Sequence, residues 1–342
     1  MRYQPFLQER GYMLRPRYRP GWVSDVGTLG RSAWDCEDAI PAPVRSLLCL
    51  QGFDVLDATR ISDNAQVVLK VVLALSTEAA IAKFLTDETG ASNYTIQFLE
   101  LIPLYDNPEW VFMVMSRMRQ CSHTPWFATV REFTEFVDQI LEGLVFLHNK
   151  NIAHRDICAM NIVMDASRMI PGGFHFLNPT TSDGTNYLRD YHGDDSDSRL
   201  VKSRTAVAPV DYYYIDFGLS VRFPSFEARQ LVTGDFGRLR KHVPEISATI
   251  PYDPFKVDIR LLGEMLRSDF LLTYTGLDFI VPFVKKLRHR NPQRRPDAVE
   301  ALAVFRTLVS KMSQRKLAEP LEHSFWDKER RAVLFLKGLG RH

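Results

Sequence analysis

The first half of the chain contains short apolar segments with the period of β-strands. Val55–Ile61 and Gln66–Val72 predict two strands, and the four polar or small residues between them, 62–65, are typical of a hairpin turn. Ile96–Leu104 and Trp110–Met115 predict two more strands. We therefore expect a small, mostly antiparallel sheet in this half of the chain.

Apolar residues with helical spacing occur once between these strands and dominate the second half. Ser76 and Thr77 are suitable N-caps for a helix that continues to Leu85. A long amphipathic helix is predicted by the spacing of Phe133, Phe136, Val137, Ile140, Leu141, Leu144 and Leu147. Asp258–Leu266 and Pro296–Met312 predict further helices, so the C-terminal part should be mainly helical.

Two segments follow neither pattern. Residues 1–43 are rich in proline, arginine and aromatic residues, and they predict an extended segment in front of one domain, 44–342. Residues 165–211 form a long irregular stretch with the polar run 192–198. We interpret this stretch as a solvated insertion rather than a metal site. It interrupts the larger of two parts of the domain, at about 44–115 and 119–342.

The composition is that of an ordinary globular protein. The chain has 342 residues, 45% of them hydrophobic and 25% charged, and its net charge of +2 gives no general reason to expect nucleic-acid or membrane binding. Basic and aromatic residues alternate in the first twenty positions, where packing on the domain surface is favoured over nucleic-acid binding. The apolar stretches 67–82 and 271–284 are interrupted by charged residues or proline, so neither predicts a membrane span.

The cysteines indicate the compartment. Cys36, Cys49, Cys121 and Cys158 lack the spacing of a zinc site, and the N-terminus lacks the apolar core of a secretory signal. We expect reduced thiols in an intracellular protein, cytoplasmic with a nuclear location left open.

Two short motifs carry the candidate chemistry. The first is the eight-residue stretch from His154 to Asn161, and the second is Asp-Phe-Gly at 216–218. Phosphoryl transfer from ATP requires a carboxylate to accept the proton of the attacking hydroxyl, and an amide and a second carboxylate to hold magnesium. Asp156, Asn161 and Asp216 have the order and spacing for these three roles.

With these motifs the chain resembles the eukaryotic protein kinases over about Val55 to Arg295. It is most similar to a fungal branch of uncharacterised kinase-like proteins with a long insertion before Asp-Phe-Gly, of which Arg15–Trp22 and the run from Tyr212 are typical. The resemblance implies an α+β, bilobal fold. The N-terminal lobe would be an antiparallel sheet with one helix, and the C-terminal lobe would be mainly helical.

The resemblance also implies which residues bind ATP. Lys70, in Val67-Val68-Leu69-Lys70, would neutralise the phosphates and pair with Glu78, because a charge within a sheet strand needs a partner. Adenine would bond to backbone groups from Ser116 to Met118, with Met115 at the back of the pocket. ATP and Mg²⁺ are the expected ligands, and Asn161 and Asp216 are the metal-binding residues.

Further matches concern architecture. Val243-Pro244-Glu245 resembles the motif that closes the activation segment, and Arg295 matches the arginine that pairs with its glutamate. Asp258 matches the helix aspartate that binds the backbone of the catalytic loop. These matches argue against a small-molecule kinase of the aminoglycoside type.

The chain departs from the kinase pattern at three places. The stretch Leu48–Val55, where a glycine-rich loop is expected, contains only Gly52. Cys158 stands where Ser/Thr kinases have a lysine, and 236–242 lacks the associated threonine; Arg238, Arg240 or Lys241 could supply the charge. Met160 replaces the arginine of tyrosine kinases.

Activation remains open in the sequence. Arg155 belongs to the type of loop that pairs with an activation-segment phosphate. The candidates for its partner are phosphorylated Ser225 or Thr233, or the acidic side chain of Glu227 or Asp235. We expect a kinase that phosphorylates protein hydroxyls, with Ser/Thr favoured over Tyr. The alternative is a pseudokinase that binds nucleotide or protein without catalysis. Substrate and oligomeric state are left open.

Overall fold

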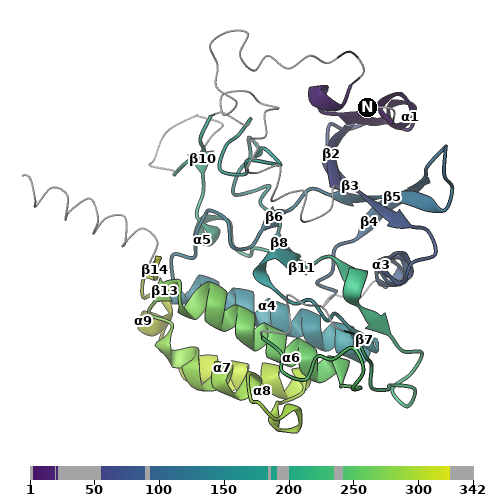
Figure 1. The fold of residues 1–342 in the computed structure, drawn as a ribbon. Helices are drawn as coiled ribbons and strands as arrows, with labels where there is room; N and C mark the ends of the chain where they lie inside the picture. The colour runs from purple at the N-terminus through teal and green to yellow at the C-terminus, as the bar shows by residue number, and fades with distance from the viewer. Residues whose placement is uncertain are drawn as a thin grey trace, which may run out of the picture.

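The structure is a computed structural model that describes residues 3–19, 21, 55–88, 93–183, 186–190, 200–234 and 242–323. It has two lobes, a smaller one built on a sheet and a larger one built on helices (Figure 1). The four strands and the helices predicted above are present, with ends that differ from the expected ones by a few residues.

The smaller lobe is a five-stranded sheet in the order β1-β2-β3-β5-β4, and every neighbouring pair is antiparallel. Its strands are β1 (Tyr12–Leu14), β2 (Val55–Arg60), β3 (Gln66–Leu73), β4 (Phe98–Pro103) and β5 (Trp110–Ser116). Buried Val67 and Leu69 alternate along β3 with side chains that face the cleft between the lobes, which places Lys70 on the cleft side.

The N-terminal segment belongs to this sheet. Proline and arginine content predicted an extended segment before residue 44, but α1 (Gln4–Glu9) and β1 form there, and β1 pairs with β2. The physical reason is burial, because Leu7, Tyr12 and Leu14 are at most 4% exposed and pack under the sheet. The sheet therefore begins before residue 44, and its first two strands are joined by residues 15–54.

Helix α3 (Thr77–Asp87) connects the two lobes by packing. The Ser76 hydroxyl caps it by accepting a hydrogen bond from the Ala79 amide, as its sequence predicts. Ala79 and Ala82 contact the sheet, whereas Ile81 and Leu85 join the core of the larger lobe. Glu78 in the first turn is therefore held at the junction of the lobes.

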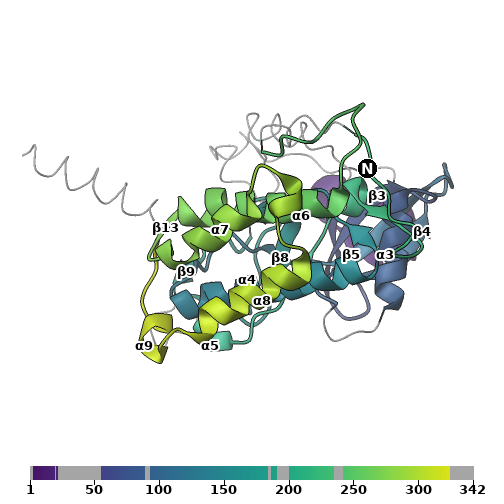
Figure 2. The same ribbon diagram turned by 90° about the horizontal axis from the view of Figure 1, so that it is seen from below.

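The larger lobe is a packed set of helices, with α4 and α8 side by side and α6 against α7 (Figure 2). The helices are α4 (Val130–Asn149), α6 (Pro254–Met265), α7 (Val281–Leu287), α8 (Ala298–Ser310) and α9 (Gln314–Leu317). The apolar face predicted for α4 is buried in this core. None of the described helices is long and apolar enough to cross a membrane.

Short strands at the cleft carry the loops of the candidate site. They are β6 (Arg119–Gln120), β7 (Ile152–Ala153), β8 (Ile162–Met164), β11 (Tyr212–Tyr214) and β12 (Val221–Arg222). β8 pairs antiparallel with β11, and β7 with β12, so the segments before and after Asp-Phe-Gly lie beside those that flank the first motif.

The insertion, 165–211, was expected to be solvated, but its described residues include secondary structure and residues buried in the core. It contains β9 (Arg189–Asp190), β10 (Leu200–Val201) and α5 (Arg204–Val207). Met169 and Ile170 are buried in the core, and the Arg204 guanidinium, 2% exposed, donates to the carbonyls of Pro125 and Cys121. The polar run 192–198 lies outside the described residues. The α+β architecture expected from the sequence is confirmed, with an antiparallel sheet in the smaller lobe and a mainly helical larger lobe.

Candidate active site

The catalytic-loop motif is held by one buried carboxylate from α6. Asp258 is fully buried and accepts hydrogen bonds from the backbone amides of His154 (2.8 Å) and Arg155 (2.6 Å). Its Oδ2 also lies 3.0 Å from His148 Nε2 at the end of α4. Because Arg155 has a positive φ of 64°, these bonds fix a backbone turn that a non-glycine residue rarely adopts.

His154 connects the two motifs through hydrogen bonds of its imidazole ring. Its Nδ1 accepts a hydrogen bond from the Asp156 amide, so its Nε2 carries the proton and donates to the Ile215 carbonyl at 3.0 Å. Complete burial lowers the pKa of His154, which keeps the ring neutral at pH 7. The histidine therefore orients Asp156 and the residue before Asp216.

Asp156 and Asn161 are brought together by the loop itself. The Asn161 side-chain amide donates to Asp156 Oδ2 at 3.0 Å and to the Asp156 carbonyl at 2.9 Å. Both residues are buried from bulk solvent and line the cleft between the lobes. The amide thus fixes the orientation of the carboxylate proposed as the base.

Asp216 is placed beside Asn161 by strand pairing. Tyr214 of β11 is opposite Ile162 of β8, and the Ile215 amide donates to the Asn161 carbonyl at 3.1 Å. Asp216 has a left-handed backbone, φ 65° and ψ 72°, which is uncommon for a residue with a side chain and often marks a functional site.

Lys70 pairs with Glu78, as predicted, and also with Asp216, which was predicted only as a metal ligand. Lys70 Nζ lies 2.5 Å from Glu78 Oε1 and 2.9 Å from Asp216 Oδ1. Burial alone would lower the pKa of Lys70, but Glu78 and Asp216 carry it above the usual value. Burial would raise the pKa of Asp216, yet Lys70 holds it below the usual value. Lys70 and Asp216 are therefore both ionised at pH 7.

Gly218 leaves room for this charge cluster. A Cβ at position 218 would lie 3.2 Å from Asp216 Oδ1 and 3.4 Å from Glu78 Oε2, tighter than most real Cβ contacts. The absence of a side chain there allows the two carboxylates to approach the same lysine.

One cavity of about 1240 Å³ lies between the lobes, and the Lys70 charge cluster, Asp156 and Asn161 line it. The eight residues predicted for the site line it: Lys70, Glu78, Met115, Ser116, Met118, Asp156, Asn161 and Asp216. Met115 and Ser116 end β5, and the next amide, of Arg117, donates to the Gln66 carbonyl at 3.0 Å. The chain crosses from lobe to lobe at this point, as expected of a hinge.

Several residues of this cavity were not predicted from the sequence. Tyr18 lines it from the N-terminal segment, and His123 from the chain that follows the hinge. The insertion contributes Phe174, Phe176, Leu177 and Pro179. The only sequence signal is an aromatic and apolar cluster after Gly172-Gly173 within an otherwise polar stretch.

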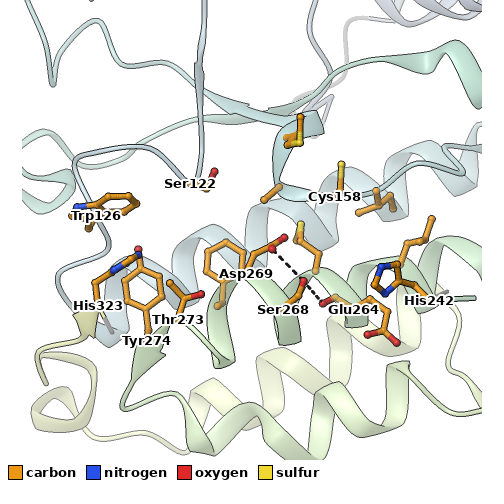
Figure 3. A pocket seen from close by; sticks show the side chains of 16 residues that line it. Ser122, Trp126, Cys158, His242, Glu264, Ser268, Asp269, Thr273, Tyr274 and His323 are labelled. Atoms are coloured by element: carbon orange, nitrogen blue, oxygen red, sulfur yellow. Dashed lines mark hydrogen bonds between the residues drawn. The ribbon is translucent and has the colours of Figure 1, made fainter. Parts of the chain in front are cut away.

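A second cavity of about 420 Å³ lies under the catalytic loop, between that loop and the end of α6 (Figure 3). Cys158 lines it, and burial raises the pKa of this thiol, so it is protonated at pH 7. Met160 lines both cavities. Asp269 faces the second cavity and accepts hydrogen bonds from Ser268 and from the Ala159 backbone.

The architectural pair expected at the end of the activation segment is also formed. Arg295, fully buried, makes two hydrogen bonds to the Glu245 carboxylate, one of them 3.0 Å long from Nη2. Arg155 donates to the Tyr252 hydroxyl at 2.8 Å and to the Thr233 carbonyl at 3.4 Å. Residues 48–54 and 235–241, with Arg238, Arg240, Lys241 and Asp235, lie outside the described residues.

Part of the chain is similar to known protein kinases. The family model for the protein kinase domain matches residues 54–171, a segment that includes Lys70, Glu78, Asp156 and Asn161 and ends before Asp216. Among solved structures, the chain is similar to the Rad53 kinase domain in its complex with SCD2 and AMPPNP. Identity is 14%, 77% of this chain and 88% of that chain are covered, and the TM-score is 0.45.

Proposed function

We propose that this protein is an ATP-dependent protein kinase that transfers the γ-phosphoryl group to protein hydroxyls. The observation that carries the proposal is the convergence of five charged or amide groups from four segments on one cavity. Ser or Thr is favoured as the acceptor, because Met160 stands where tyrosine kinases have an arginine.

Each residue has a role that follows from its contacts. Asp156, oriented by Asn161, would accept the proton of the attacking hydroxyl. Lys70, held by Glu78, presents its ammonium group toward the cavity and would bind phosphate oxygens. Backbone groups from Ser116 to Met118, beside Met115, would bind the adenine.

The donors present fit a magnesium ion. Asn161 supplies an amide oxygen and Asp216 an ionised carboxylate, and Mg²⁺ prefers one or two such protein oxygens together with water and phosphate. Bound there, the ion would neutralise charge on the phosphates. The same carboxylate now binds Lys70, so Asp216 would be shared between the lysine and the metal.

The test is transfer of labelled phosphate from ATP to a diverse peptide array, with magnesium or manganese. We expect Asp156→Asn to lower transfer by about 10²- to 10⁴-fold, the usual contribution of a positioned base, without lowering ATP binding in a thermal-shift assay. Asp138→Asn is the matched control, because Asp138 forms an exposed ion pair with Arg306 on the helical lobe.

Equal transfer by wild type and Asp156→Asn would contradict the enzymatic proposal. Binding of ATP without transfer under either metal would support a nucleotide-binding pseudokinase instead. The observation that favours this second candidate is the protonated Cys158 thiol at the position of the phosphate-contacting lysine.

A further inference from the structure

A second buried charge cluster lies at the hinge side of the cleft, away from the predicted metal ligands Asn161 and Asp216. Arg15 Nε lies 2.9 Å from Asp57 Oδ1 of β2, and these side chains are 11% and 5% exposed. On the other side, Arg15 Nη1 lies 2.8 Å from His175 Nε2 of the insertion. Arg15 therefore joins the sheet lobe to a segment that follows the catalytic loop.

The insertion side of this cluster is anchored to the helical lobe. His175 donates its amide to the Thr181 carbonyl at 2.9 Å, and because an arginine only donates, Nε2 is the ring nitrogen that accepts from Arg15 and Nδ1 carries the ring proton. The preceding residues Met169 and Ile170 are buried in the helical core. His175 is thus fixed to the larger lobe, whereas Arg15 directly follows β1 of the smaller one.

The hinge is held by the neighbouring aromatic ring. Phe174, 8% exposed, packs against the Arg117 guanidinium at 4.7 Å and the Arg119 guanidinium at 4.9 Å from the ring centre. Arg119 also donates to the Pro179 carbonyl at 2.6 Å. The insertion therefore packs against the side chains that follow β5, and Phe174 directly precedes His175 of the Arg15–His175 contact.

The residues next to this contact line the cavity at the hinge, where the nucleobase would bind. Phe174, Phe176 and Leu177 line the cavity from the insertion. Tyr18 lines it from the N-terminal segment, and its ring lies under the Arg15 guanidinium at 5.5 Å. Separating the lobes would pull Arg15 and Tyr18 away from His175 and widen the cavity at this end.

We propose that Arg15, Asp57 and His175 form an interlobe clasp that limits lobe opening and thereby slows nucleotide entry and release. The clasp rests on the proposed function only for the identity of the ligand, since the lobe contact itself needs no nucleotide. The clasp would hold nucleotide in the cleft by restraining the lobes near the nucleobase. Such a restraint is useful in a chain whose expected glycine-rich loop, which would cover the phosphates, has only one glycine.

Lobe separation can be measured without nucleotide. Donor and acceptor dyes would be attached through unnatural amino acids at exposed Ser62 and Gln293, one in each lobe, and their distance followed by single-molecule fluorescence transfer. We expect Arg15→Ala and His175→Ala, in the full chain, to increase the population of the more distant state at least several-fold. Melting curves would show that both variants are folded.

The matched control is Arg60→Ala. Arg60 pairs with Asp63 at 2.6 Å within one hairpin of the same sheet, so its loss should leave the distance distribution unchanged. If both Arg15→Ala and His175→Ala give the wild-type distribution, the clasp is wrong. If Arg60→Ala opens the lobes as much as Arg15→Ala, loss of charge on the lobe is the cause and the clasp is also wrong.

The second arm measures release of a fluorescent ATP analogue by stopped flow. We expect the two clasp variants to release it about 5- to 10-fold faster than wild type, with association accelerated as well. Wider distances with unchanged rates would overturn control of nucleotide passage. A wild-type protein that binds no analogue would overturn the proposed function, while the distance measurement would still decide whether the clasp exists.

Discussion

The catalytic loop and the interlobe clasp are both buried clusters of charged side chains, but they are built in different ways. Asp156 and Asn161 lie five residues apart on one loop, and Asp258 fixes that loop through two backbone amides. The clasp takes Arg15, Asp57 and His175 from segments up to 160 residues apart, and it is made by side chains alone.

The difference indicates that the proposed catalytic geometry depends on backbone hydrogen bonds, whereas the proposed control of access depends on side-chain contacts. Backbone hydrogen bonds to Asp258 cannot be lost without distorting the loop, because the amides of His154 and Arg155 are buried there. The clasp contacts can open and close without unfolding either lobe. We therefore expect changes in the first cluster to alter stability strongly, and changes in the second to alter it less.

The largest effect should come from Asp258→Ala. The substitution leaves two buried amides without an acceptor, and each such group costs about 1–3 kcal/mol, so we expect a loss of about 3–5 kcal/mol of stability. Urea unfolding would measure it. Asp138→Ala is the control and should cost at most about 1 kcal/mol, because its pair with Arg306 is exposed. Similar losses for the two variants would remove the contrast between the clusters.

Phe174→Ala should have a smaller effect. Truncation of a fully buried core phenylalanine to alanine costs about 3–5 kcal/mol of stability. Two neighbours of the Phe174 ring are guanidinium groups rather than apolar side chains, so we expect a loss of about 2–3 kcal/mol. Phe226→Ala is a close control, since an arginine also lies 4.7 Å from the Phe226 ring, but that ring is 68% exposed. Urea unfolding should show a loss below about 0.5 kcal/mol for the control. A loss for Phe174→Ala no larger than this would show that the insertion is not fixed to the hinge.

The smallest effect concerns pH. Burial, with help from Arg119, lowers the pKa of His123 to about 4, below the usual 6.5. The folded protein keeps this ring neutral, so its contribution to stability is complete above pH 6.5 and is lost as the pH falls toward 4. We expect His123→Gln to flatten the decline in melting temperature between pH 7 and pH 5. Parallel curves for variant and wild type would contradict this.

The catalytic loop could be predicted from the sequence because its residues are local. Asp156 and Asn161 lie five residues apart on one loop, and Asp-Phe-Gly follows a second strand. Once β8 pairs with β11, Asp216 lies beside Asn161. The strands β2 to β5 could also be predicted, because the alternation of apolar residues is a local signal along each strand. The family match at 54–171 covers most of these elements.

The clasp and the cavity wall could not be predicted in this way. Arg15 and His175 have no motif that relates them, and a buried Asp57 looks like any polar residue on an alternating strand. The proline content of the first 43 residues concealed β1, whose three residues are too few to show a period. Their places depend on long-range packing, which a single sequence does not reveal.

The position of β1 has a consequence for the order of folding. Its partner β2 lies beyond residues 15–54, a connection of 40 residues, whereas β2 and β3 are joined by a short hairpin. Closing the longer loop costs about 1.7 kcal/mol more entropy than closing one of about six residues, and burial of Leu7, Tyr12 and Leu14 offsets it. Strand β1 should therefore join the sheet after the local hairpins have formed, and Arg15 would meet His175 only in the final stage of folding.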